Sequence, residues 1–196
     1  MSKSKIAMTA IVSVLVLAII GLTIGLVIVA SQASLSSNMN LSYSVNEVEC
    51  TITASGTYQE AAIKCGTVAE TFDQDSITVT ATKGTTTTGA VYFQNVTLTA
   101  TDIATYTFAI TNNSATVGIA RDITVTLTDN TGNTNAKIGN VVVKINGEEI
   151  TSASTTKEAT IEASGNEDIV ITCQVADSTL PANVNIAIAM NLVAAN

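Results

Sequence analysis

One stretch of this sequence has the spacing of a calcium-binding loop. Residues 129–135 read Asp-Asn-Thr-Gly-Asn-Thr-Asn, so oxygen-bearing side chains alternate around a central glycine. Asp129, Asn133 and Asn135 are the candidate metal ligands, because Ca²⁺ is bound by carboxylate and amide oxygens. Strong calcium loops carry several carboxylates and this one has one, so the other interpretation is an ordinary Asn- and Gly-rich turn. We expect no cofactor, with calcium as the alternative.

Catalytic groups are scarce in this chain. It contains no histidine, which excludes nucleophiles activated by a Ser–His or Cys–His pair. Gly84 and Gly89 stand at the spacing of a phosphate-binding loop, but no Lys-Ser or Lys-Thr follows them, so nucleotide binding is not expected. No motif supports a Ser–Lys or paired-carboxylate enzyme. We therefore predict that the protein is not an enzyme.

Residues 6–30 form an uninterrupted apolar run without a charged side chain. As an α-helix, a run of this length would span about 37 Å, compared with about 30 Å for the hydrocarbon core of a bilayer. It therefore predicts one N-terminal transmembrane helix that holds the protein in a membrane. Lys3 and Lys5 precede the run and the next basic residue is Lys64, which places the N-terminus in the cytoplasm and the rest outside.

The apolar segment leaves two alternatives open. Ser31-Gln32-Ala33 offers the small residues that a signal peptidase prefers, so cleavage near Ala33 and secretion is the alternative to a retained anchor. Gly21 and Gly25 form a Gly-x-x-x-Gly pair, which lets two membrane helices approach closely and dimerise. The other interpretation of this pair is that small residues are simply common in membrane helices.

The part of the chain after the anchor is acidic. Two of the eight Lys and Arg residues precede the apolar run, which leaves six against sixteen Asp and Glu, a net charge of −10. A surface of this charge repels nucleic acid and anionic lipid headgroups. No nucleic-acid partner is therefore expected.

The chain has three cysteines, and we expect two of them to form a disulfide and the third to lie in the core. Outside the cell thiols usually pair, and Cys50 and Cys65 are the candidate disulfide. Cys173 lies in an alternating run on the same side as Ile169 and Ile171, which predicts a buried, unpaired thiol that acts as a small hydrophobic residue. A disulfide from Cys173 to either of the others, or to another molecule, is the alternative, because spacing does not determine connectivity.

Strand signals recur from residue 39 to the C-terminus. Apolar and polar residues alternate with a period of two in ten runs that are rich in Thr, Val and Ile. The runs are 39–45, 48–52, 77–82, 91–99, 104–111, 119–128, 139–145, 158–163, 168–175 and 184–193. Short strands at this spacing predict an all-β fold, an antiparallel β-sandwich or jelly roll of about ten strands. We assign residues 1–33 to the anchor, 34–38 to a linker and 39–196 to this domain.

Three connections between the runs carry their own predictions. Asn146-Gly147 accepts positive φ at both positions, so it predicts a type I′ turn that joins 141–145 to 148–152 as a hairpin. Gln59–Lys64 is the one segment outside the anchor that suits a turn of helix. Lys83–Gly89, with four consecutive threonines, is expected to be a flexible loop or a minor subdomain boundary.

Three stretches together resemble a family of exported proteins. They are Val91-Tyr92-Phe93-Gln94-Asn95-Val96-Thr97-Leu98, Tyr106-Thr107-Phe108-Ala109-Ile110-Thr111-Asn112-Asn113-Ser114, and Ile161-Glu162-Ala163-Ser164-Gly165-Asn166-Glu167-Asp168-Ile169-Val170-Ile171. Their residue pattern is similar to that of TasA/camelysin-type proteins of Gram-positive bacteria, in which such strands belong to a jelly roll. The resemblance implies a subunit of a biofilm-matrix fibre or a surface coat.

The resemblance also implies a mode of assembly. In such fibres the N-terminal strand of one subunit completes the sheet of the next, as in β-augmentation. Met39, Leu41, Tyr43 and Val45 form the candidate donor strand of this chain. The alternative is that this strand pairs within its own domain.

Taken together, these features predict a membrane-anchored or exported cell-surface protein with a structural or adhesive, non-enzymatic role. Its expected partners are the membrane, through residues 6–30, and further copies of itself. The alternative function is an anchored binding module for a cation, a glycan or a partner protein. Exposed aromatic clusters, or several carboxylates at one end of the sandwich, would favour that alternative.

Overall fold

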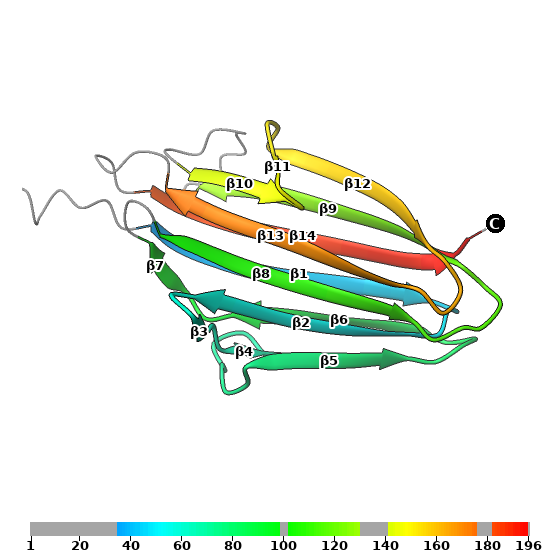
Figure 1. The fold of residues 1–196 in the computed structure, drawn as a ribbon. Helices are drawn as coiled ribbons and strands as arrows, with labels where there is room; N and C mark the ends of the chain where they lie inside the picture. Colours follow the sequence, from blue (N-terminus) through cyan, green and yellow to red (C-terminus); the bar gives the residue numbers. More distant parts are fainter. Residues whose placement is uncertain (1–34, 99–101, 130–140, 176–181, 196) are drawn as a thin grey trace, which may run out of the picture. The chain divides into compact units, whose positions relative to one another are not determined.

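The alternating runs form β-strands throughout the described part of the chain. The computed structural model describes residues 35–98, 102–129, 141–175 and 182–195. These residues form fourteen strands and no helix, and the strands lie in two seven-stranded sheets, here called sheet A and sheet B (Figure 1). The predicted all-β, two-sheet fold is confirmed.

The N-terminal segment is described from Leu35 onward. The predicted membrane segment, residues 6–30, lies outside the described residues, and so do Gly21 and Gly25. Within the four described ranges, no helix has the length and apolar character needed to cross a membrane. The first strand begins at Leu35, so the segment predicted as a linker, 34–38, is mostly strand.

Sheet A is built around the first and the last strand of the domain. Its order is β12-β9-β14-β1-β6-β4, and β7 also pairs with β1. The bounds are β1 Leu35–Asn46, β4 Cys65–Gly66, β6 Thr86–Phe93, β7 Val96–Leu98, β9 Ile119–Asp129, β12 Ser154–Ile161 and β14 Ala182–Ala194. β1 is antiparallel to β6 but parallel to β14, from Leu35 opposite Ala182 to Val45 opposite Leu192.

The parallel pair corrects the prediction of a purely antiparallel sandwich. All other strand pairs of the described structure are antiparallel. Antiparallel neighbours can be joined by a tight hairpin, whereas parallel neighbours need a long connection. β1 and β14 are separated by almost the whole domain, so no short turn constrains their relative direction.

Sheet B is antiparallel throughout. Its order is β11-β10-β13-β8-β2-β3, and β5 also pairs with β2. The bounds are β2 Cys50–Tyr58, β3 Ala61–Ala62, β5 Ser76–Ala81, β8 Ile103–Asn112, β10 Val141–Ile145, β11 Glu148–Glu149 and β13 Asn166–Val175. In both sheets together, ten strands have five or more residues, and each overlaps one of the ten predicted runs, although the run 91–99 is divided between the end of β6 and β7. The other four, β3, β4, β7 and β11, are too short to show an alternating pattern.

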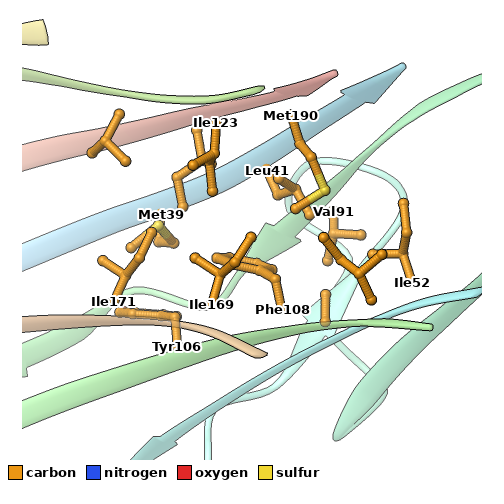
Figure 2. Packing of buried hydrophobic residues seen from close by; sticks show 14 of the residues in the cluster. Met39, Leu41, Ile52, Val91, Tyr106, Phe108, Ile123, Ile169, Ile171 and Met190 are labelled. Atoms are coloured by element: carbon orange, nitrogen blue, oxygen red, sulfur yellow. The ribbon is translucent and has the colours of Figure 1, made fainter. Parts of the chain in front are cut away.

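The core lies between the two sheets. Figure 2 shows Met39 and Leu41 of sheet A directed toward the layer of Tyr106 and Phe108 of sheet B, and all four side chains are fully buried. The ring of Phe93 on β6 lies edge-on to Tyr106 at a centroid distance of 5.1 Å and to Phe108 at 6.2 Å. Edge-to-face contacts of this kind add to the free energy of apolar burial. The aromatic cluster therefore joins the two sheets.

Two polar side chains are buried among the described residues, and both connect the sheets. Asn112, at the end of β8, donates from Nδ2 to the carbonyl oxygens of Val117 at 2.8 Å and Glu162 at 2.9 Å. Arg121 on β9 donates from Nε and Nη2 to the two carboxylate oxygens of Glu167 on β13, at 3.0 and 2.5 Å. Buried polar groups of this kind stabilise a fold when their hydrogen bonds are complete.

Turn geometry confirms one of the predicted connections and corrects two. Asn146 and Gly147 have φ of 49° and 83°, as a type I′ turn requires, and they join β10 to β11. Gln59 and Glu60 also have positive φ, 48° and 64°, and form a tight hairpin between β2 and β3 instead of a turn of helix. The threonines after Lys83 are not a flexible loop, because β6 begins at Thr86 and pairs with β1.

Replacing Asn146 with alanine is expected to lower the free energy of unfolding by about 1–2 kcal/mol. Alanine tolerates the left-handed conformation poorly, and the bond in which the Val170 N–H donates to Asn146 Oδ1, at 2.7 Å, is lost. Urea denaturation measures the change. Asn146→Gly is the matched control, because it keeps the left-handed geometry and loses the bond alone. If the alanine variant were as stable as the native chain, the assignment of a type I′ turn at this position would be wrong.

Candidate functional site

The structure does not test the predicted calcium site, because most of the loop 129–135 lies outside the described residues. Asp129 is the last residue of β9, where its backbone pairs with Val184. Asn133 and Asn135 lie outside the described residues. Among the His, Cys, Asp and Glu residues of the described ranges, no group of three or more is placed to hold a metal ion.

All three cysteines are buried, free thiols. Cys50 lies on β2 of sheet B and Cys65 on β4 of sheet A, and the structure shows no disulfide between them. Burial raises the pKa of Cys50 to about 11 and that of Cys173 to about 12. Because the thiolate is the reactive form, these thiols are poor nucleophiles at neutral pH. The prediction of a buried, unpaired Cys173 is confirmed.

The candidate donor strand is the middle of β1. Met39, Leu41 and Val45 are fully buried, and Tyr43 is half-buried opposite Gly89 of β6. A Cβ at position 89 would overlap the Tyr43 hydroxyl, so a larger residue there would displace the Tyr43 ring. β1 pairs on both sides with strands of its own chain, as the alternative prediction stated.

A groove of about 350 Å³ lies on the outer face of sheet A, and we call it the asparagine groove. It is lined by Asn40, Ala69, Glu70, Phe72, Tyr92, Asn95 and Asn185. Asn40 on β1 stands directly opposite Tyr92 on β6, and Asn185 lies on the neighbouring strand β14. Strand alternation places these side chains outside because Leu41 and Val91, next to Asn40 and Tyr92, point into the core.

One wall of the asparagine groove is a tight turn after β4. The Thr71 N–H donates to the Val68 carbonyl at 3.2 Å, and Glu70 has a left-handed φ of 70°. A Cβ at Gly66 would overlap the Thr71 carbonyl oxygen, so the turn folds back over a position that must be glycine. This close packing holds Glu70 and Phe72 at the groove.

Within the described part of the chain, the three asparagine side chains of the groove have no structural partner. Asn40, Asn95 and Asn185 make no side-chain hydrogen bond to another described residue. Asparagines elsewhere do make such bonds: Asn46 donates to Asn191 at 3.1 Å, and Asn112 and Asn146 also have partners. The donors and acceptors of the groove are therefore free to bind a ligand.

The two aromatic residues of the asparagine groove are also separate from the core. The chain has seven Phe and Tyr residues. Five of them belong to the core or pack against it, namely Tyr43, Tyr58, Phe93, Tyr106 and Phe108. Phe72 and Tyr92 do not, although each is half-buried, and both line this groove. An aromatic cluster outside the core is the feature that favours a binding module.

Two other hollows in the described structure do not combine unpaired amide side chains with aromatic rings outside the core. An open groove of about 490 Å³ crosses β12, β9, β14 and β1, but several of its polar side chains are paired: Ser42 Oγ donates to the Ile188 carbonyl at 3.1 Å, and the Thr124 and Thr156 hydroxyls are 2.8 Å apart. A hollow of about 150 Å³ at one end of the sandwich is lined by Glu47, Val48, Glu49, Lys83, Ser114, Val117 and Ala194, without an aromatic ring.

Sequence patterns did not reveal the asparagine groove. Its lining comes from residue 40, residues 69–72, residues 92–95 and residue 185, so no local motif contains it. The one available signal was the alternation in β6, where Tyr92 is an aromatic residue on the outer face between the buried Val91 and Phe93.

Comparisons with known proteins do not assign the chain to a family. No family model matches it, and no curated protein matches it. Forty-five chains of solved structures match, among them the yeast delta-COP-I mu-homology domain, with 8% sequence identity and a TM-score of 0.21 over 81% of this chain and 95% of that one. A TM-score of this size does not establish a shared fold.

Proposed function

We propose that this protein has a structural, non-enzymatic role at the cell surface, as a subunit of a coat or matrix fibre. In this proposal residues 6–30 form a transmembrane helix, the β-sandwich lies outside the cell, and no cofactor is required. Release after cleavage near Ala33 is the alternative fate of the anchor. The resemblance to TasA/camelysin-type proteins and their jelly roll supports the proposal, as does the acidic composition of the domain.

The observation that carries the proposal is the position of β1. This strand begins five residues after the apolar run and is inserted between β14 and β6 in the interior of sheet A. Eleven of its residues pair with β14 and seven with β6. If β1 is removed, a slot with unpaired backbone groups on both sides remains, and an identical strand from another copy satisfies the same groups.

The shortest edge strands are poor templates for edge-to-edge pairing, whereas β5, with six residues, pairs with β2 alone and leaves a longer edge on sheet B. β3, β4 and β11 have two residues each, which is too short to template another strand. β12 carries Lys157 and Glu158, and charged residues protect an edge strand from unwanted pairing. Exchange of β1 offers a route to ordered self-assembly that does not use these edges.

Cysteine cross-linking in cells tests this proposal. Ser42 on β1 stands opposite Ala189 on β14, and both side chains are exposed on the outer face. Neighbouring strands bring Cα atoms to a distance that suits a disulfide. Two differently tagged chains, one with Ser42→Cys and one with Ala189→Cys, are co-expressed and oxidised, and strand exchange predicts a mixed disulfide dimer.

The matched control pairs Ser42→Cys with Thr107→Cys, which lies on the outer face of sheet B and should give no dimer. A double variant, Ser42→Cys with Ala189→Cys in one chain, shows that the pair can be oxidised. If that double variant formed only an intrachain disulfide, and the co-expressed single variants gave no dimer, self-assembly by strand exchange would be wrong.

A further inference from the structure

We propose that the asparagine groove is a binding site for a neutral carbohydrate, a pyranose unit at the end or within the chain of an oligosaccharide. This inference goes beyond the structural role and does not depend on strand exchange. It gives the glycan-binding alternative a location: the outer face of sheet A, between β14, β1, β6 and the turn that follows β4.

The three amides of the groove provide the polar contacts. A carboxamide offers two N–H donors and a carbonyl acceptor in one plane, which suits neighbouring hydroxyls that both donate and accept hydrogen bonds. Asn40 and Asn185 lie on paired rigid strands, and Asn95 lies in the link between β6 and β7. Because none of the three is bonded to another described residue, a bound sugar replaces water and breaks no bond within this part of the protein.

The two rings of the groove provide the apolar contacts. One face of a pyranose ring consists of C–H groups, and this apolar face packs on the flat face of an aromatic side chain. A tyrosine ring is suited to this contact because it combines an apolar face with a polar hydroxyl. Tyr92 is held on β6 opposite Asn40, so a ring and an amide lie side by side on the sheet. Phe72 approaches from the turn that Gly66 allows.

The negative charge around the groove favours a neutral sugar over an acidic one. The number of carboxylates in the groove favours binding over cleavage. Glu70 is the one charged side chain among the described residues that line the groove, and the domain as a whole is strongly acidic. Uronic acids and sialic acids are therefore repelled. Glycoside hydrolysis ordinarily requires a pair of carboxylates about 5–10 Å apart, and a single Glu70 does not supply that pair.

The size of the groove fits this ligand class. Small-molecule sites are commonly about 300–1,000 Å³ and combine apolar surface with a few placed polar groups. The asparagine groove, at about 350 Å³, lies at the lower end of that range. The larger groove over β9 and β14 offers fewer polar groups to a ligand, because several of its polar side chains are already paired.

Isothermal titration calorimetry on the full chain, in a detergent without a sugar headgroup, tests the site. The probes are maltohexaose, cellohexaose, mannohexaose and chitohexaose, with oligogalacturonate as the acidic comparison. We expect saturable binding of at least one neutral probe. We also expect Asn95→Ala and Tyr92→Ala each to weaken that binding at least tenfold.

Matched variants separate the site from the fold. Asn166→Ala removes another exposed and unbonded amide, on sheet B, and Val68→Ala shortens an exposed side chain in the turn beside Phe72. Both should bind within twofold of the native chain. Thermal melting shows whether each variant is folded, and Asn95 is exposed, so its replacement leaves the core intact. Binding of none of the neutral probes, binding unchanged by both groove variants, or tighter binding of oligogalacturonate would overturn the proposal.

Discussion

Replacing Asn112 with alanine is expected to lower the free energy of unfolding by about 3 kcal/mol, because a buried side chain loses four hydrogen bonds at once. The side chain is 1% exposed. Its Nδ2 donates to the carbonyls of Val117 and Glu162, with Ile161 O at 3.3 Å as a further acceptor, and its Oδ1 accepts from the Ser114 N–H at 3.0 Å. Alanine can replace none of these bonds, and they lie around a side chain that is itself shielded from water.

The neighbouring residue provides a matched control. Asn113 is exposed, and its side chain makes one bond, to the Thr51 hydroxyl at 2.9 Å. Asn113→Ala should therefore cost less than about 1 kcal/mol, because water replaces the lost bond. Urea denaturation of the two variants gives the comparison. Equal losses of stability would show that the network around Asn112 does not stabilise this end of the sandwich.

Replacing Arg121 with alanine is the second large effect, and we expect a loss of about 3 kcal/mol. Arg121 is 4% exposed and makes a bidentate pair with Glu167, which is 24% exposed. Its Nη1 also donates to the Lys157 carbonyl at 2.8 Å. Without the guanidinium, Glu167 remains as a partly buried charge and the carbonyl of Lys157 loses a donor. Removing one partner of a buried pair destabilises far more than breaking an exposed pair.

An exposed pair in the same domain is the control for Arg121. Lys64 contacts Asp75 at 2.8 Å, with exposed fractions of 45% and 65%. Lys64→Ala should cost about 0–1 kcal/mol, and added salt should reduce that cost further. The cost of Arg121→Ala should change little with salt. Similar costs for both variants, or a strong salt dependence for Arg121→Ala, would contradict the role of the buried pair.

Both large effects concern the edge strand β12. Asn112 donates a hydrogen bond to the carbonyl oxygen of Ile161, the last residue of β12, and Arg121 donates one to the carbonyl oxygen of Lys157. β12 pairs on one side only, with β9, and these two side chains from β8 and β9 add to its other side-chain contacts. Hydrogen exchange in each variant should therefore rise first in β12.

Local patterns in the sequence were enough to predict the elements and much of the core. Alternation with a period of two depends on which side chains of one strand avoid water, and ten runs identified the ten long strands. The same reasoning placed Cys173 in the core, and Asn146-Gly147 determined a turn because few residues tolerate positive φ twice in succession. Gln59 and Glu60 adopt the same geometry without that chemistry, so their turn was missed.

The tertiary structure alone decided which strands are neighbours and what they bring together. The parallel pairing of β1 with β14, and the separation of Cys50 and Cys65 onto different sheets, follow from the packing of segments far apart in the chain. The asparagine groove arises in the same way, since Asn40, Tyr92 and Asn185 meet through strand pairing and Phe72 arrives on a turn. Alternation determines the face on which a side chain lies, but it contains no information about the strand beside it, because that choice depends on the packing of the whole core.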